Sequence, residues 1–147
     1  MTLADVLLDA SRRPLVIKDC AVFLDEEVAA KGGISGLAIK GGYKVIKKLK
    51  PGIIAEAFDS LLDDFAARLE PFFAESQAAG KRFSEFAPGR ASDIAEALLG
   101  ITDARAARAE NRVMLKTYEK LRPFGKKNVE QAVPGIGRLI DKHASPA

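Results

Sequence analysis

The sequence predicts an all-α fold, an irregular bundle of about six to eight helices with no significant sheet. Apolar side chains recur every three to four residues along almost the whole chain, which is the period of an amphipathic helix. No segment alternates like a strand, and no tight turn joins two apolar runs. The length of 147 residues suits one domain with a buried core. We expect this domain over residues 1–143, followed by a frayed tail at 144–147.

The first two helices are predicted from their end signals. Thr2 and Asp5 match a capping box, and the apolar residues that follow have helical spacing. A second helix is expected between Pro14, which favours a first helical turn, and the Gly32–Gly33 pair, which favours a helix end. Apolar residues cover most of the circumference of this helix, which indicates a position near the centre of the bundle.

The next two helices carry opposite charges. Residues 31–52 contain six lysines and no acid. We expect a helix over residues 35–49 with an apolar side formed by Ile39, Val45, Ile46 and Leu49, opposite a lysine arc formed by Lys40, Lys44, Lys47 and Lys48. A further helix is expected to begin at Ile53 and to have a long apolar stripe. Its opposite face is acidic and solvated, is expected to be oriented toward those lysines, and contains Glu56, Asp59, Asp63 and Asp64. Pro71 should kink or interrupt this helix, and Gly80 should end it.

The last third of the chain is predicted as a loop followed by further helices. Residues 81–90 indicate a loop, and a helix then begins at Ser92 or Asp93 and is broken or bent at residues 100–103. Further helices are expected at about 103–121, 128–133 and 134–143. The helix at 103–121 should expose one basic strip that contains Arg105, Arg108, Arg112, Lys116 and Lys120.

Composition excludes several classes of protein. The single cysteine, Cys20, cannot form an internal disulfide or a cysteine-based metal site, and its apolar neighbours indicate a buried, unreactive thiol. Acids within the first apolar pattern, with no basic region before them, do not match a secretory signal. No uncharged apolar run approaches the ~18 residues that span a bilayer. We therefore expect a cytoplasmic protein without a membrane span.

No residue pattern is typical of catalysis or of a metal site. The acids at 56–64 lack the Glu-x-x-His partners of a helical di-iron site, and we expect the only histidine, His143, to be exposed. The segment from Gly36 to Gly42 has the glycine spacing of a phosphate-binding loop but lacks its Lys-Ser/Thr pair and a preceding strand. We predict no catalytic residue, cofactor or metal, and we do not expect an enzyme.

The glycines of residues 32–42 have a structural interpretation. A glycine inside a helix costs up to ~1 kcal/mol relative to alanine, so a close approach of two backbones should offset the cost. We therefore predict a turn and close helix packing at Gly32, Gly33, Gly36, Gly41 and Gly42.

Three function hypotheses follow from these patterns. In the leading one, a binding or scaffold module presents Lys40, Lys44, Lys47 and Lys48 to an acidic protein or other polyanion. In the second, residues 28–46 form a degenerate DNA-binding helix-turn-helix with Ala29 at the helix crossing and Ile34 packed inward. The third is a small-molecule-binding protein or enzyme whose pocket residues are far apart in sequence. A membrane-surface helix is disfavoured because the apolar side of residues 35–49 is needed by the bundle.

The segment around these lysines also resembles a known family. The run GGISGLAIKGGYKVIKKLKPG, together with the Phe/Leu-rich acidic helix up to Pro71, is similar to a small family of uncharacterised bacterial proteins of actinobacterial type. The resemblance implies a wholly helical protein of similar length. It implies no activity and supplies no catalytic residue.

Overall fold

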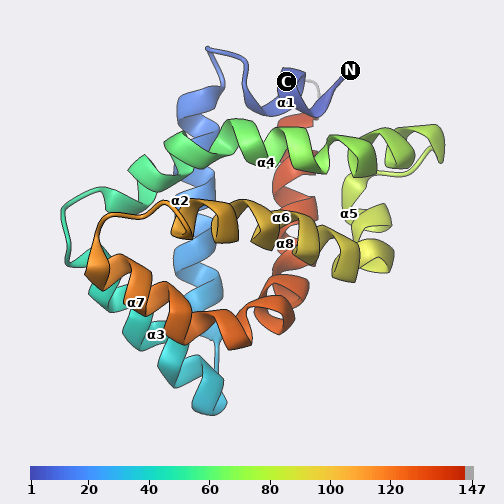
Figure 1. Ribbon diagram of the computed structural model, residues 1–147. Helices are drawn as coiled ribbons and strands as arrows, with labels where there is room; N and C mark the ends of the chain where they lie inside the picture. The colour runs from blue at the N-terminus through green and yellow to red at the C-terminus, as the bar shows by residue number, and fades with distance from the viewer. Residues whose placement is uncertain (145–147) are drawn as a thin grey trace.

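The computed structural model describes residues 1–144, and this part of the chain forms eight α-helices, two short 3₁₀ helices and no strand (Figure 1). The prediction of an all-α fold without a sheet is therefore confirmed. Ala144 ends the last helix, and the rest of the tail predicted at 144–147 lies outside the described residues. The α-helices are α1 (Leu3–Leu7), α2 (Arg13–Ala30), α3 (Gly33–Lys47), α4 (Ile53–Ala78), α5 (Phe83–Phe86), α6 (Ala91–Ala106), α7 (Arg112–Leu121) and α8 (Gly125–Ala144), and the 3₁₀ helices are η1 (Ala87–Arg90) and η2 (Arg122–Phe124).

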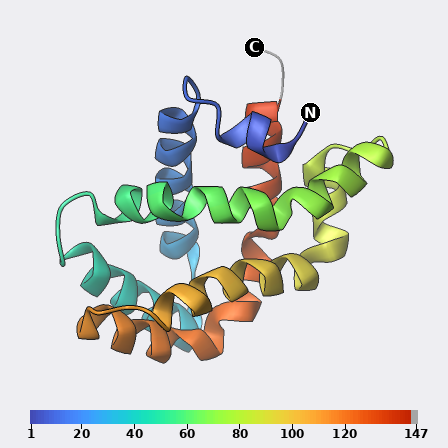
Figure 2. The same ribbon diagram turned by 45° about the horizontal axis from the view of Figure 1, so that its top comes forward.

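Four long helices frame the molecule. Helix α4 packs on α1, α2 and α6, while α8 packs on α5 and α6 and also contacts α2. Figures 1 and 2 show α2 and α8 running roughly alongside each other, with α4 and α6 crossing them. Helices α3 and α7 pack on each other and form one corner of the molecule, away from α1 and α5.

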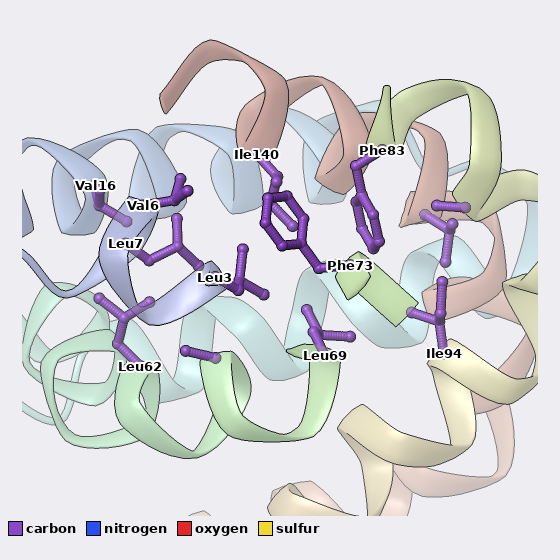
Figure 3. Packing of buried hydrophobic residues seen from close by; sticks show 13 residues of the cluster. Leu3, Val6, Leu7, Val16, Leu62, Leu69, Phe73, Phe83, Ile94 and Ile140 are labelled. Atoms are coloured by element: carbon purple, nitrogen blue, oxygen red, sulfur yellow. The ribbon is translucent and has the colours of Figure 1, made fainter. Parts of the chain in front are cut away.

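The short helix α1 supplies much of the core. Its capping box is present as predicted: the Asp5 amide donates to Thr2 Oγ1 at 3.1 Å, and the Thr2 amide donates to Asp5 Oδ2 at 2.8 Å. Leu3, which is fully buried, lies with Leu7 between α4 and the pair α2/α8 (Figure 3). The Leu3 amide donates to Glu70 Oε2 on α4 at 2.6 Å. Burial and capping thus hold a helix that is too short to be stable alone.

Helix α2 matches its predicted extent, with Pro14 in the first turn. The next helix, α3, begins at Gly33, two residues before the predicted start. Gly33 has a φ of 72°, a left-handed conformation that favours glycine. This glycine therefore makes the sharp change of direction between the two helices. Gly80, which follows α4, also has a positive φ, of 68°, and ends α4 as predicted.

Two prolines lie inside continuous helices. Helix α4 runs through Pro71, so of the predicted kink or interruption the interruption is not found. Helix α8 runs through Pro134, so residues 128–143 form part of one helix rather than two. The flanking residues explain this outcome. Leu69 and Phe73 are buried on α4, and Val133 is fully buried on α8. Packing on both sides of each proline offsets its local cost of ~3 kcal/mol.

Two further boundaries differ from the prediction. Within the loop predicted at 81–90, residues 83–90 form α5 and η1, because Phe83 and Ala87 are buried there. The helix predicted at 103–121 is instead broken between α6 and α7, where Asn111 Oδ1 accepts a hydrogen bond from the Met114 amide at 3.0 Å and caps α7. Since α6 packs on α4 and α8 while α7 packs on α3, the predicted basic strip is divided between two helices.

Candidate functional site

The solvent-facing side of α3 combines lysines with exposed aliphatic residues. Ile34 and Leu37 are 85% and 73% exposed, the highest values among the large hydrophobic residues described. Lys40, Lys44 and Lys48 follow along the same side of the helix, are exposed, and have no ion-pair partner within residues 1–144. We call these five residues the α3 outer face. Val45, predicted to pack inward, is 43% exposed, because its position falls on the same side of the helix as Ile34.

Lys47 differs from the other three lysines. Its Nζ lies 3.2 Å from Asp25 Oδ1 on α2 and 5.2 Å from the centre of the Tyr43 ring. The Tyr43 hydroxyl donates to the same carboxylate. The hydrogen bond from Tyr43 lowers the pKa of Asp25, burial opposes this, and Lys47 adds to the lowering. Lys47 therefore ties α3 to α2 and is not part of the α3 outer face.

The acids of α4 pair with other cations and not with the α3 outer face. Arg13 bridges Asp59 at 3.1 Å and Asp63 at 3.2 Å. Arg105 on α6 contacts Asp64 at 3.0 Å, and Lys50 contacts Glu56 at 2.7 Å. The expectation that these acids face the lysine arc is therefore wrong, since Lys50, the one lysine among these partners, lies outside that arc. Because the acids pair with residues of α2, α6 and the loop, the positive charge of Lys40, Lys44 and Lys48 is left uncompensated.

The glycines of residues 32–42 have different surroundings. A Cβ at Gly42 would lie 2.6 Å from Leu121 Cδ1, so this glycine is where α7 approaches α3 closely. A Cβ at Gly36 would meet the Lys31 carbonyl carbon at 2.8 Å. No atom lies within 4 Å of such a Cβ at Gly32, Gly33 or Gly41.

The packing that the helix-turn-helix interpretation requires is not found. Ala29, expected at a tight helix crossing, is exposed. Ile34, expected to pack inward, is 85% exposed. Ile34 turns outward because α3 packs on its neighbours through its other side, where Gly36 is buried and Ile39, Tyr43 and Ile46 are half-buried.

A second feature is an apolar pocket at the centre of the four long helices. Its volume is about 300 Å³, and its wall contains no charged residue. We call it the central pocket. The wall is formed by Leu7, Val16, Cys20, Phe23, Leu24, Phe58, Leu62, Phe65, Leu69, Leu98, Leu99, Thr102, Val129, Ala132, Ile136, Leu139 and Ile140. These residues come from α1, α2, α4, α6 and α8. Because they are far apart in the sequence, its patterns do not predict that they line one pocket.

The two side chains of the wall that are not pure hydrocarbon, Cys20 and Thr102, carry no charge. Burial, and secondarily the charge of Asp19, raises the pKa of the Cys20 thiol to about 12, which keeps it neutral. Thr102 Oγ1 donates to the Leu99 carbonyl at 3.1 Å and lies 2.8 Å from the Tyr118 hydroxyl. Tyr118 and Arg122 in turn donate to Asp103. The Thr102 hydroxyl is therefore satisfied within the protein.

His143 is buried instead of exposed, which corrects the prediction. Its side chain is 1% exposed, and its Nε2 lies 2.8 Å from Asp19 Oδ2 on α2. Lys142 Nζ reaches the same oxygen at 2.9 Å, and Arg12 Nη1 donates to the His143 carbonyl at 2.6 Å. These contacts fasten the end of α8 to α2. His143 lies inside because α8 continues to Ala144, so His143 falls on the side of this helix that also buries Val133 and Ile140.

Neither a metal cluster nor a membrane-spanning helix is found in residues 1–144. No three His, Cys, Asp or Glu side chains in this range come together in a way that could hold a metal ion. None of the helices described is both long enough and apolar enough to cross a bilayer.

Comparison with known proteins identifies a family and no characterised relative. A family model described as a family of unknown function (DUF6918) matches residues 3–144. No curated protein and no solved structure matches the chain.

Proposed function

Since the chain belongs to this family of unknown function, we propose its function from geometry: a non-enzymatic binding module whose α3 outer face takes an acidic protein partner. One observation carries the proposal. Three unpaired lysines lie beside the two most exposed aliphatic residues of the described chain. Ile34 and Leu37 lie one helical turn apart on the same side of α3, and exposed apolar side chains that adjoin one another and are rimmed by polar residues mark interaction sites.

The charge pattern favours an acidic partner. The acids of α4 that pair with Arg13 and Arg105 already have a cation. The α3 outer face has a field that no acid of residues 1–144 neutralises by a direct ion pair. Such a field raises the association rate of a negatively charged partner and disfavours basic ones.

The aliphatic residues favour a protein over a nucleic acid. Burying one Leu or Ile side chain contributes about 1.5–3 kcal/mol, whereas an exposed ion pair contributes about 0–1 kcal/mol. Ile34 and Leu37 would therefore supply most of the affinity, and the lysines would supply orientation. A phosphate backbone has no apolar surface that could contact Ile34 or Leu37, whereas an acidic amphipathic helix has both an apolar face and negative charge.

This proposal predicts that charge reversal on α3 weakens binding by about tenfold. The variant is K44E/K48E, and the matched control is K18E/K81E, which makes the same charge change at two exposed lysines without an ion-pair partner among the described residues. The measurement is fluorescence anisotropy of a labelled Glu/Leu-rich amphipathic peptide across a salt series. The control should bind as the wild type does at moderate salt.

A second variant separates the apolar contribution. I34S/L37S should lose at least tenfold in affinity while leaving the salt dependence unchanged, because no charge is removed. Absence of peptide binding at low salt, or equal weakening by K44E/K48E and K18E/K81E, contradicts the proposal. Tighter binding to duplex DNA would instead support a DNA-binding role, and tighter binding to phosphatidylglycerol vesicles would support a membrane-surface role.

A further inference from the structure

We propose that the central pocket binds an uncharged apolar small molecule of about ten to twelve carbon atoms. The inference is independent of the α3 outer face, since the two sites share no residue. It rests on the size of the pocket, the chemistry of its wall and the incomplete burial of the aromatic rings that form it.

The size of the pocket sets the size of the ligand. An apolar cavity of ~150 Å³ in an engineered protein takes one benzene molecule. The central pocket, at about 300 Å³, has roughly twice that volume and lies at the lower end of the range for small-molecule sites. A two-ring hydrocarbon or a chain of about ten carbons matches this volume.

The chemistry of the wall disfavours a ligand that would place a charged group inside the pocket. Of its side chains, only Cys20 and Thr102 are not pure hydrocarbon, and neither is available to neutralise a charge, because the thiol is protonated and the hydroxyl is already hydrogen-bonded. A carboxylate or ammonium group placed there would lose its hydration without a partner. An uncharged ligand loses no such hydration.

Other side chains of the protein do not completely bury the aromatic rings of the pocket wall. Phe23, Phe58 and Phe65 are only half-buried although they line the middle of the fold. Protein interiors contain few voids larger than a water molecule, and burying an aromatic ring contributes some of the largest apolar stabilisation available. A ligand in the pocket would cover these rings and recover stabilisation that the free protein lacks.

One glycine on α8 shapes the pocket. A Cβ at Gly135 would lie 2.3 Å from Phe23 Cε1, so a glycine at this position allows the Phe23 ring to approach α8 closely. Phe23 then forms a wall of the pocket instead of filling it. The close contact is thus part of how the opening between α2 and α8 is made.

The test uses naphthalene, an uncharged ten-carbon hydrocarbon, on the full chain. Saturable one-to-one binding is expected by its fluorescence, with methyl NMR shifts at Val129 and Leu139 and none at Ile34. The variant A132F places a ring in the pocket and should weaken binding at least tenfold. The matched control A67F adds the same ring at an exposed position of α4 and should bind as the wild type does.

Two further arms keep the outcome decisive. A132L fills less of the pocket and should give an intermediate loss, so it replaces A132F if that variant does not fold. Naphthalene-2-sulfonate, of similar shape but charged, should bind at least tenfold more weakly than naphthalene. Non-saturable binding, equal affinity of A132F and wild type, or equal affinity for the charged probe would overturn the proposal.

Discussion

Replacing Gly137 with alanine is expected to lower the free energy of unfolding by about 2 kcal/mol. A Cβ at this position would lie 2.7 Å from Ser84 Cα and 3.2 Å from the Ser84 amide nitrogen, both backbone atoms of α5. Helix α5 would have to move away from α8. That movement would loosen the buried Phe83 and Ala87 and stretch the hydrogen bond from the Ser84 amide to Asp141 Oδ1, now 3.3 Å. Overpacking of this kind costs ~1–3 kcal/mol or more and exceeds the ~1 kcal/mol that alanine gains as a helix former.

A glycine-to-alanine substitution at Gly41 should change the free energy of unfolding in the opposite direction. Gly41 lies inside α3, and no atom lies within 4 Å of a Cβ placed there. We expect G41A to raise the free energy of unfolding by up to ~1 kcal/mol, because only the conformational term changes. Urea unfolding followed by circular dichroism measures both variants. A stabilising effect of G137A would mean that α5 does not pack as closely on α8 as the structure shows.

The helices that were predicted correctly have local signals at their ends. The Thr2/Asp5 capping box, Pro14 in a first turn and the glycine at 80 all act through neighbouring atoms, so the sequence alone identifies them. The helix through Pro71 was harder to predict because two terms compete there. The local cost of a proline is known, but the burial of Leu69 and Phe73 around it depends on α1 and α8, which the sequence does not place.

The α3 outer face could be predicted only in part. Helical period places the lysines in one arc, but it does not reveal that Asp25, from another helix, engages Lys47 and leaves Lys44 free. The central pocket could not be predicted from the same patterns. The sequence pattern of an apolar stripe is the same whether its side chains fill a core or line a pocket. A sequence signal near the pocket was Gly135 inside a helix, since such a glycine indicates the close approach of another element, here Phe23.

Replacing Asp19 with asparagine is expected to lower the free energy of unfolding at pH 7 by about 1–3 kcal/mol. Burial disfavours the ionised form of Asp19, but hydrogen bonds from Lys142 and His143 outweigh it, so the folded-state pKa lies below the ordinary value of an aspartate. A lowered folded-state pKa stabilises the protein above the unfolded pKa, and this stabilisation is lost as pH falls through the folded-state value. The difference between wild type and D19N should therefore be full at pH 7 and shrink below about pH 4.

The measurement is a series of urea unfolding curves at fixed ionic strength from pH 7 down to the acid transition. D93N is the matched control, because Asp93 is 64% exposed and pairs only with Arg90 at i,i+3, so its loss should cost less than ~1 kcal/mol. Asparagine keeps the shape of Asp19 and can still accept a hydrogen bond from His143, which isolates the charge. If D19N and D93N were equally mild at pH 7, packing alone would hold the buried end of α8. If D19N is the more severe, the carboxylate that links α2 to α8 joins segments 124 residues apart and stabilises the frame that encloses the central pocket.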